Sequence, residues 1–173
     1  MRLLVMGDTH IPNRAKTISP HIIDFIDDFS PHAILFTGDA CEPGVLMFLE
    51  KLAPLHAVLG NMDKIDLPKM LNFDFGKKIL LIHGHQFGRG NYEELTRYAS
   101  GYDILICGHT HHQEHFKKNG VLIINPGSVT GAETNGIKPP STFTTIIIKA
   151  GVKIQEYVVK EDGIQKQRSK VRN

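Results

Sequence analysis

Short apolar runs recur along the chain, and each of them ends at a turn-forming or polar residue. The runs are rich in Val, Ile and Leu and do not alternate between polar and apolar positions, which is typical of strands buried on both faces of a sheet. We therefore predict six buried central strands, in residues 2–6, 33–37, 56–59, 78–82, 103–107 and 121–124.

Helix-spaced apolar positions fill the intervals between the early runs. The stretch from Ser19 to Phe29 opens with Ser-Pro, a typical helix start, and its apolar residues then recur at helical spacing. The stretches from Pro43 to Lys51 and from Tyr92 to Ser100 are predicted as a second and a third helix.

Beyond residue 112 the pattern contains strands only, predicted at 113–117, 121–124, 142–149 and 152–160. The dipeptide Ala150-Gly151 between the last two is a hairpin signal. A β-α-β beginning followed by a β-rich second half predicts an α/β fold of two packed sheets with helices outside. The loop from Gly131 to Ser141 is predicted to be a surface excursion.

The chain shows no internal repeat and no linker, so residues 1–165 are predicted to form a single domain. A chain of 173 residues is long enough for one well-buried core. The segment from Glu161 onward is polar and basic and is predicted to fray. Residues 166–173, with Lys166, Arg168, Lys170 and Arg172, are set apart from the domain as a basic tail.

Composition narrows the class of protein. No apolar run reaches the ~20 residues of a membrane helix, and the N-terminus lacks a signal-peptide pattern, so we expect no membrane contact and a cytoplasmic location. Two cysteines are too few for a disulfide framework. A formal charge of +2 is too weak to indicate nucleic acid, whereas ten histidines are many for this length.

Residues with metal-binding atoms stand at the ends of five of the six runs. Ligands of open α/β sheets bind beyond the carboxyl ends of the strands, so we expect these side chains on one rim. A single Asp-x-His after a strand is more often a cap or a turn, but an ordered series of five such motifs indicates a site. The series comprises Asp8, His10, Asp39, Asn61, His83, His109 and His111.

This ligand set combines carboxylate and amide oxygens with imidazole nitrogens. It suits Mn²⁺, Fe, Zn²⁺, Ni²⁺ or Co²⁺ better than Ca²⁺. Seven ligands are too many for one tetrahedral zinc and fit two ions that share a carboxylate. We predict two divalent metal ions, with Mn²⁺ as the first candidate.

The ordered motifs D-x-H, G-D, G-N, H-G-H and G-H-x-H resemble the calcineurin-like metallophosphoesterase superfamily. Within it, the stretch from Asn125 to Ala132 is similar to the small phosphodiesterases related to the Vps29 retromer subunit. The resemblance implies a four-layer α/β/β/α sandwich. It also implies a first metal at Asp8, His10 and His111, a second at Asn61, His83 and His109, and a bridge at Asp39.

In that scheme a hydroxide bridging the two metals attacks the phosphorus of a small phosphodiester, and Asn61 helps to stabilise the growing charge. Asp39, Asn61 and His85 are the predicted catalytic residues. Many superfamily members have a histidine after the Asn that protonates the leaving group, but this chain has Met62, which we expect to pack beneath the site.

Several other polar residues have simpler expected roles. Asp63 is predicted to be either a turn residue or an acceptor that orients a ligand imidazole, and Cys41 to be a plain buried thiol. His112 and His115 are expected on the surface of the following strand.

Three functions stay open: a phosphodiesterase, a Vps29-like protein-interaction scaffold with a residual metal site, and a nuclease. The complete ligand series favours the first. Only the basic tail supports the third, and because four basic residues in a polar end segment are more often a solvated terminus, we do not expect a nucleic-acid partner. Edge strands and an apolar sheet face would support a homodimer.

Overall fold

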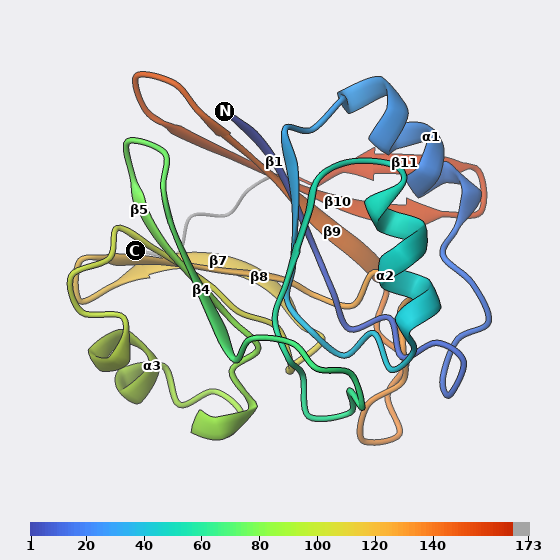
Figure 1. Ribbon diagram of the computed structural model, residues 1–173, viewed down its shortest axis with the longest axis horizontal. Helices are drawn as coiled ribbons and strands as arrows, with labels where there is room; N and C mark the ends of the chain where they lie inside the picture. Colours follow the sequence, from blue (N-terminus) through green and yellow to red (C-terminus); the bar gives the residue numbers. More distant parts are fainter. Residues whose placement is uncertain (168–173) are drawn as a thin grey trace.

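The computed structural model describes residues 1–167, and two β-sheets that face each other form its centre (Figure 1). The first sheet has six strands in the order β11-β10-β9-β1-β2-β3, and the second has five in the order β4-β5-β6-β8-β7. The strands are β1 (Arg2–Met6), β2 (Ala33–Phe36), β3 (Leu55–Ala57), β4 (Met70–Asp74), β5 (Lys78–Ile82), β6 (Ile104–Ile106), β7 (Gln113–Lys118), β8 (Val121–Pro126), β9 (Ser141–Ile148), β10 (Val152–Lys160) and β11 (Gly163–Lys166).

Helices cover the outer faces of the sheets. Figure 1 shows α1 (Pro20–Phe29) and α2 (Pro43–Glu50) on one flank, and α3 (Tyr92–Tyr98) on the other. A single-turn 3₁₀ helix, η1 (His85–Phe87), precedes α3. The three predicted α-helices are confirmed, and α1 begins at Pro20 and buries Ile22 and Ile26 as its apolar stripe predicts.

Side chains of each central strand alternate between two cores. Leu3 and Val5 of β1 enter the core between the two sheets, whereas Leu4 and Met6 enter the core under α1 and α2. A third core, which includes Leu95 of α3, lies between that helix and the second sheet. The predicted four-layer α/β/β/α arrangement is therefore confirmed.

Parallel pairing determines where the site lies. In the first sheet β1, β2 and β3 are parallel neighbours, and in the second β5, β6 and β8 are parallel neighbours. The carboxyl ends of the parallel strands within each sheet meet at one edge, so the loops that follow them are brought together. The antiparallel strands β9, β10 and β11 extend the first sheet sideways, beyond β1.

Three strand predictions were wrong or incomplete. The run 56–59 was predicted as a buried central strand, but β3 is an edge strand and its three residues are only partly buried. The pattern missed β4, an edge strand whose exposure alternates from residue to residue. It also missed β11, which pairs with β10 over Gly163–Lys166, where a frayed segment was predicted. Arg168, Lys170 and Arg172 lie outside the described residues.

His115 was predicted on the surface, and this was wrong. It is buried in β7, and its Nδ1 lies 2.7 Å from Oε1 of Glu156 in β10. Burial of a polar ring is tolerated here because the carboxylate provides a hydrogen-bond partner. His112 is exposed, in agreement with the prediction.

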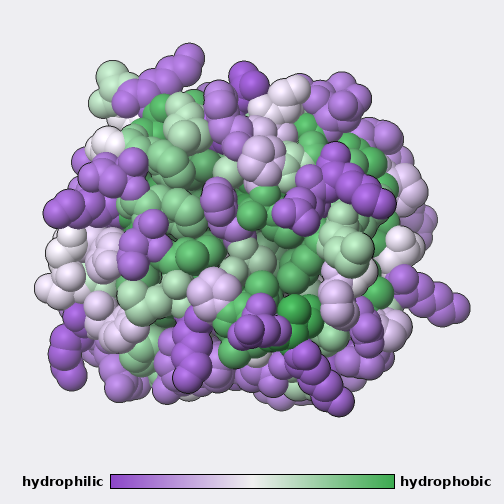
Figure 2. Space-filling view, viewed as in Figure 1, coloured by the Kyte–Doolittle hydropathy of each residue, from purple (hydrophilic) through white to green (hydrophobic). Residues whose placement is uncertain are grey.

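The surface retains a number of large apolar side chains. Figure 2 shows apolar residues gathered in the middle of one face, with hydrophilic residues toward its margins. Within residues 1–167, no helix is both long enough and apolar enough to cross a membrane.

That two copies of the chain form a homodimer stays a prediction. The large exposed apolar residues are Met1, Met47, Phe48, Met62, Met70, Tyr98 and Ile137.

Candidate metal centre

The structure brings all seven predicted ligand residues together beyond the carboxyl ends of the parallel strands. They come from five separate loops, so no local segment could form the cluster alone. Asp8 and His10 follow β1, Asp39 follows β2, Asn61 follows β3, His83 follows β5, and His109 and His111 follow β6. Their assignment as metal ligands stays a prediction.

The backbone of these loops is strained. Asp8, His10, Asp39, His109 and His111 all have φ between 49° and 69°, in the left-handed region that non-glycine residues rarely adopt. Such conformations cost about 1–3 kcal/mol each and persist where surrounding contacts enforce them, often at functional sites. Here the Asp8 N–H donates to the Gly38 carbonyl at 2.9 Å, and the His10 N–H donates to the Asp39 carbonyl at 3.0 Å.

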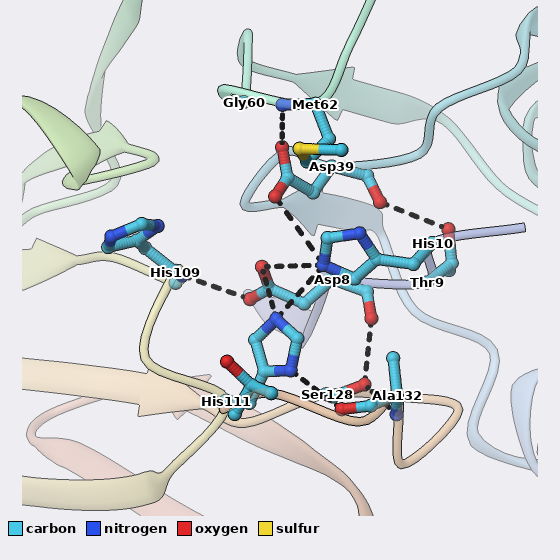
Figure 3. Close-up of polar contacts among 12 residues, drawn as sticks. Asp8, Thr9, His10, Asp39, Gly60, Met62, His109, His111, Ser128 and Ala132 are labelled. Atoms are coloured by element: carbon cyan, nitrogen blue, oxygen red, sulfur yellow. Dashed lines mark hydrogen bonds and ion pairs between the residues drawn. The ribbon is translucent and has the colours of Figure 1, made fainter. Parts of the chain in front are cut away.

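One group of acceptor atoms converges from Asp8, His10 and His111 (Figure 3). The Nδ1–H of His111 donates to the Ala132 carbonyl at 2.8 Å, so the Nε2 atom of the neutral ring carries a lone pair. That Nε2 lies 2.9 Å from Nε2 of His10 and 3.5 Å from Oδ1 of Asp8. Asp8 Oδ1 is buried and has no hydrogen-bond partner among the described residues. A cation at this point would satisfy all three groups.

A second convergence involves Asp39, Asn61 and His83. The Nδ1–H of His83 donates to the Thr37 carbonyl at 2.7 Å, so its Nε2 also presents a lone pair. This Nε2 lies 3.1 Å from Oδ1 of Asn61 and 3.5 Å from Oδ2 of Asp39. The carbonyls that hold the imidazoles of His83 and His111 fix the tautomer that a metal ligand requires.

Asp39 lies between the two groups. Its Oδ2 is 3.4 Å from Nε2 of His10 and 3.5 Å from Nε2 of His83. The other oxygen, Oδ1, accepts the Met62 backbone N–H at 2.8 Å, which fixes the carboxylate plane (Figure 3). The orientation of Asp39 therefore suits a carboxylate shared between two cations.

His109 and His85 are less tightly placed. The His109 ring lies 5.2 Å from the His83 ring, and its backbone N–H donates to Oδ2 of Asp8 at 3.1 Å. His85 lies in η1, with its ring 5.3 Å from that of His83, and it does not line the cavity described below. Its predicted catalytic role stays a prediction.

Burial controls the protonation of the site. It raises the pKa of Asp8 well above its usual range, with the Asp39 charge as the next cause, and it raises the pKa of Asp39 to about 6. Burial also lowers the pKa of His10 and His83 to about 3, and that of His109 to about 4. The imidazoles are thus neutral ligands at neutral pH, and a cation would relieve the buried carboxylates.

One prediction about a supporting residue held in part, and another was wrong. Asp63 is a turn acceptor, as one of its two predicted roles has it, because its carboxylate accepts the Gly60 backbone N–H at 2.8 Å. It also accepts the backbone N–H groups of Asp39 and Cys41 at 2.9 and 2.8 Å and so joins two site loops, and none of these contacts orients an imidazole. Met62 does not pack beneath the site, because its side chain is 37% exposed and lines the cavity. Cys41 is buried, as predicted, and its Sγ lies 3.8 Å from Nδ1 of His10.

Glycines permit the loops to approach this closely. A Cβ on Gly60 would lie 2.0 Å from Oδ1 of Asp39, and a Cβ on Gly108 would lie 2.7 Å from Oδ2 of Asp8. Neither distance is compatible with a side chain. The glycines that precede Asn61 and His109 are therefore needed for the carboxylates to reach their positions.

A cavity of about 530 Å³ opens over the centre. The sequence reasoning missed six of its lining residues, because they lie in loops with no ligand motif. The only signal was position: Arg14 follows His10 in the same loop, and the Gly131–Ser141 excursion is rich in turn formers. The missed residues are Asn13, Arg14, Arg89, Glu133, Thr134 and Asn135.

Comparison with known proteins agrees with this geometry. A sequence model of the calcineurin-like phosphoesterase superfamily domain matches residues 1–150. The chain belongs to this superfamily. A probable metallophosphoesterase from Methanothermobacter thermautotrophicus is a superfamily relative. It is 39% identical over an alignment of 137 positions that covers 75% of this chain and 78% of that protein.

Solved structures show the same phosphoesterase fold. Wild-type Vps29 of Entamoeba histolytica, complexed with Zn²⁺, superposes with a TM-score of 0.88 at 32% identity, over 96% of this chain and 97% of that one. An archaeal phosphodiesterase superposes with a TM-score of 0.72 over 92% of this chain and 100% of that one. At 23% identity the latter likeness concerns the fold alone.

Proposed function

We propose that the protein is a metal-dependent phosphodiesterase with a binuclear centre. The observation that supports this most directly is the convergence of metal-binding atoms, with Oδ2 of Asp39 placed between His10 Nε2 and His83 Nε2. Lone pairs that face one another this closely repel unless a proton or a cation lies between them. Two such points that share a carboxylate fit two ions better than one.

The ligand assignment follows the two convergences. Asp8, His10 and His111 would hold the first ion, and Asn61, His83 and His109 the second, with Asp39 common to both. The two ions would supply Lewis acidity toward the phosphoryl group and an acidified water as nucleophile. Mn²⁺ stays the first candidate; Zn²⁺, Ni²⁺, Fe and Co²⁺ suit the same ligands, and Zn²⁺ is the ion named for the E. histolytica Vps29 structure.

The protein side chains would hold and orient the substrate. The cavity places Asn61 and His109 beside the centre, where the Asn61 amide can stabilise charge on a phosphoryl oxygen. Met62 occupies the position from which many relatives protonate the leaving group, and a thioether has no proton to give. Esters with weakly basic leaving groups are therefore the expected substrates.

A metal-reconstitution screen tests the proposal. Metal-free protein is loaded in turn with Mn²⁺, Zn²⁺, Ni²⁺, Fe²⁺ and Co²⁺ and assayed with bis(p-nitrophenyl) phosphate, p-nitrophenyl phosphate and nucleotides. We expect hydrolysis of the diester with at least one ion and loss of that activity in EDTA. The absence of turnover with every ion, in protein shown to hold two ions, would contradict a phosphodiesterase.

A protein-interaction scaffold is the second candidate. The likeness to Vps29 over nearly the whole chain and the exposed Met47 and Phe48 of α2 favour it. The complete ligand series favours retained chemistry instead, and the two roles are separable, since a scaffold would bind its partner equally well without metal. The nuclease alternative rested on a basic tail, most of which lies outside the described residues.

A further inference from the structure

Two arginines stand at the rim of the cavity over the metal centre. Arg14 lies in the loop between β1 and α1, and Arg89 lies between η1 and α3. Arg14 Nη1 donates to the Glu133 carbonyl at 3.2 Å. Arg89 Nη2 donates to the Thr134 hydroxyl and, at 3.4 Å, to the His109 carbonyl. Both guanidiniums are thus attached to the 131–141 loop that forms the cavity wall.

These contacts leave the charge of both guanidiniums unpaired. Within residues 1–167, neither arginine lies within 4.0 Å of a carboxylate oxygen. A guanidinium has five N–H donors, and the contacts above involve one nitrogen of each. The planar fork that remains matches the oxygens of a phosphate in a bidentate arrangement.

The charge balance of the cavity indicates what the arginines bind. Two divalent ions on Asp8 and Asp39 would leave two positive charges, and the Asp63 carboxylate, which accepts the Asp39 backbone N–H, removes one of them. The arginines add two more, and Glu133, the other acidic residue of the lining, removes one. A simple phosphodiester brings a single negative charge, so it would leave this cavity with a surplus of positive charge.

The remaining lining is polar and offers no platform for an apolar group. Among the described residues that line the cavity, Met62 is the one apolar side chain. An acyl chain or an aromatic base would find little to pack against here. Recognition beyond the scissile phosphate must therefore come from polar and charged contacts, and the two arginines are the strongest of these.

We propose that Arg14 and Arg89 bind a second phosphate of the substrate, so that the preferred substrate is a small phosphodiester carrying a further phosphate monoester. This inference rests on the proposed function and adds a substrate class to it. The two arginines are specificity determinants and stand apart from the metal ligands.

A matched pair of substrates tests the inference by turnover. p-Nitrophenyl ethyl phosphate and p-nitrophenyl 2-(phosphonooxy)ethyl phosphate share a leaving group and differ by the second phosphate. For the Mn²⁺-loaded wild type we expect kcat/KM to favour the phosphorylated ester by about 10–100-fold, since each charge-assisted contact at an exposed site is worth about tenfold. The variant Arg14→Gln/Arg89→Gln should reduce that ratio to near one. Arg97→Gln, an exposed arginine of α3 away from this cavity, should leave it unchanged.

A binding measurement gives a readout that does not depend on turnover. Calorimetry of the metal-loaded protein compares 1,2-ethanedisulfonate with ethanesulfonate, two oxyanions that bind metals weakly. We expect about tenfold tighter binding of the disulfonate to the wild type, and equal affinities in the double variant.

The outcomes separate the two levels of the proposal. If the ethyl ester is cleaved and the phosphorylated ester is no better, the second-phosphate inference is wrong and the phosphodiesterase stands. If neither ester is cleaved, the proposed function falls, and the calorimetry still decides the anion site. Equal affinities of the wild type for the two sulfonates would overturn the second-phosphate inference.

Discussion

The Nε2 atoms of His10 and His111 lie 2.9 Å apart although 101 residues separate them in the chain. The Nδ1–H of His111 is committed to the Ala132 carbonyl, so its Nε2 can only accept. When Nδ1 of His10 is the protonated nitrogen, facing the Cys41 sulfur at 3.8 Å, two lone pairs face each other. This arrangement is favourable around a cation.

Replacement of Asp39 by Asn should remove the shared carboxylate and leave the fold intact. We expect about two divalent ions per chain in the wild type, fewer in Asp39→Asn, and a loss of at least ~10²–10³-fold in kcat/KM. Because burial raises the pKa of Asp39 to about 6, the metal-free variant loses a buried charge at neutral pH and should melt no lower than the wild type. Metal analysis and thermal melting check both points. A wild type with one tightly held zinc and no second site would exclude a binuclear centre.

Replacement of Asn61 by Ala should affect turnover more than it affects the first ion. Asn61 is a neutral ligand that lies 3.1 Å from His83 Nε2 and outside the Asp8–His10–His111 group. We expect a loss of about 10²-fold in kcat and weaker binding of the second ion only. Titration with Mn²⁺, followed by calorimetry and activity, distinguishes the two sites. Full activity of the mutant at limiting Mn²⁺ would place Asn61 outside the centre.

The stabilisation of the fold by Mn²⁺ should weaken as the pH falls. The folded-state pKa of Asp39 is raised to about 6, so between its usual value and about 6 the metal-free folded protein holds a proton there. The raised pKa of Asp8 adds to this competition. The low pKa values of His10 and His83 keep both imidazoles neutral over the same range. The rise in Tm at fixed Mn²⁺ should therefore be full above about pH 7 and shrink as pH falls through about 6. A constant rise down to about pH 5 would contradict the assignment of Asp39.

A side chain at Gly60 should lower both the stability of the fold and the affinity for metal. In Gly60→Ala the new Cβ would lie 2.0 Å from Asp39 Oδ1, so the carboxylate or the loop must move. We expect a loss of about 1–3 kcal/mol in the free energy of unfolding, together with weaker metal binding. Gly44→Ala is the matched control, because a Cβ there meets nothing within 4 Å. Equal stability and metal affinity in the two variants would show that the loop adapts.

Sequence reasoning predicted most of the fold and the convergence of the seven candidate ligand residues, because both depend on local signals. Buried strands such as β1 and β5 are continuous apolar runs, and parallel strands place their following loops at one edge. The edge strand β4 was missed because its side chains are only partly buried, which weakens the apolar signal. Arg89 was missed because its place at the same cavity as Arg14 depends on the path of the 131–141 loop, which no local pattern encodes.

Met62 provides the sharpest test of the chemistry. Its side chain lines the cavity, so a histidine at this position would face the substrate. General acid catalysis typically contributes ~10²–10⁴ in rate, and the wild type lacks this donor. We expect aryl phosphodiesters, whose leaving groups are weak bases, to be cleaved readily and alkyl phosphodiesters much more slowly.

Met62→His should then accelerate alkyl esters selectively, because an alkoxide leaves only with a proton and an aryl oxide does not need one. The measurement is kcat/KM against leaving-group pKa for both proteins at fixed Mn²⁺ and pH, with a steep negative slope in the wild type and a shallower one in the variant. Met62→Gln, which has similar length and no dissociable proton, is the control and should keep the steep slope. A flat plot for the wild type would mean that a donor is already in place. His85 would then be the first residue to replace, since its ring lies 5.3 Å from that of His83 and 6.3 Å from that of His109.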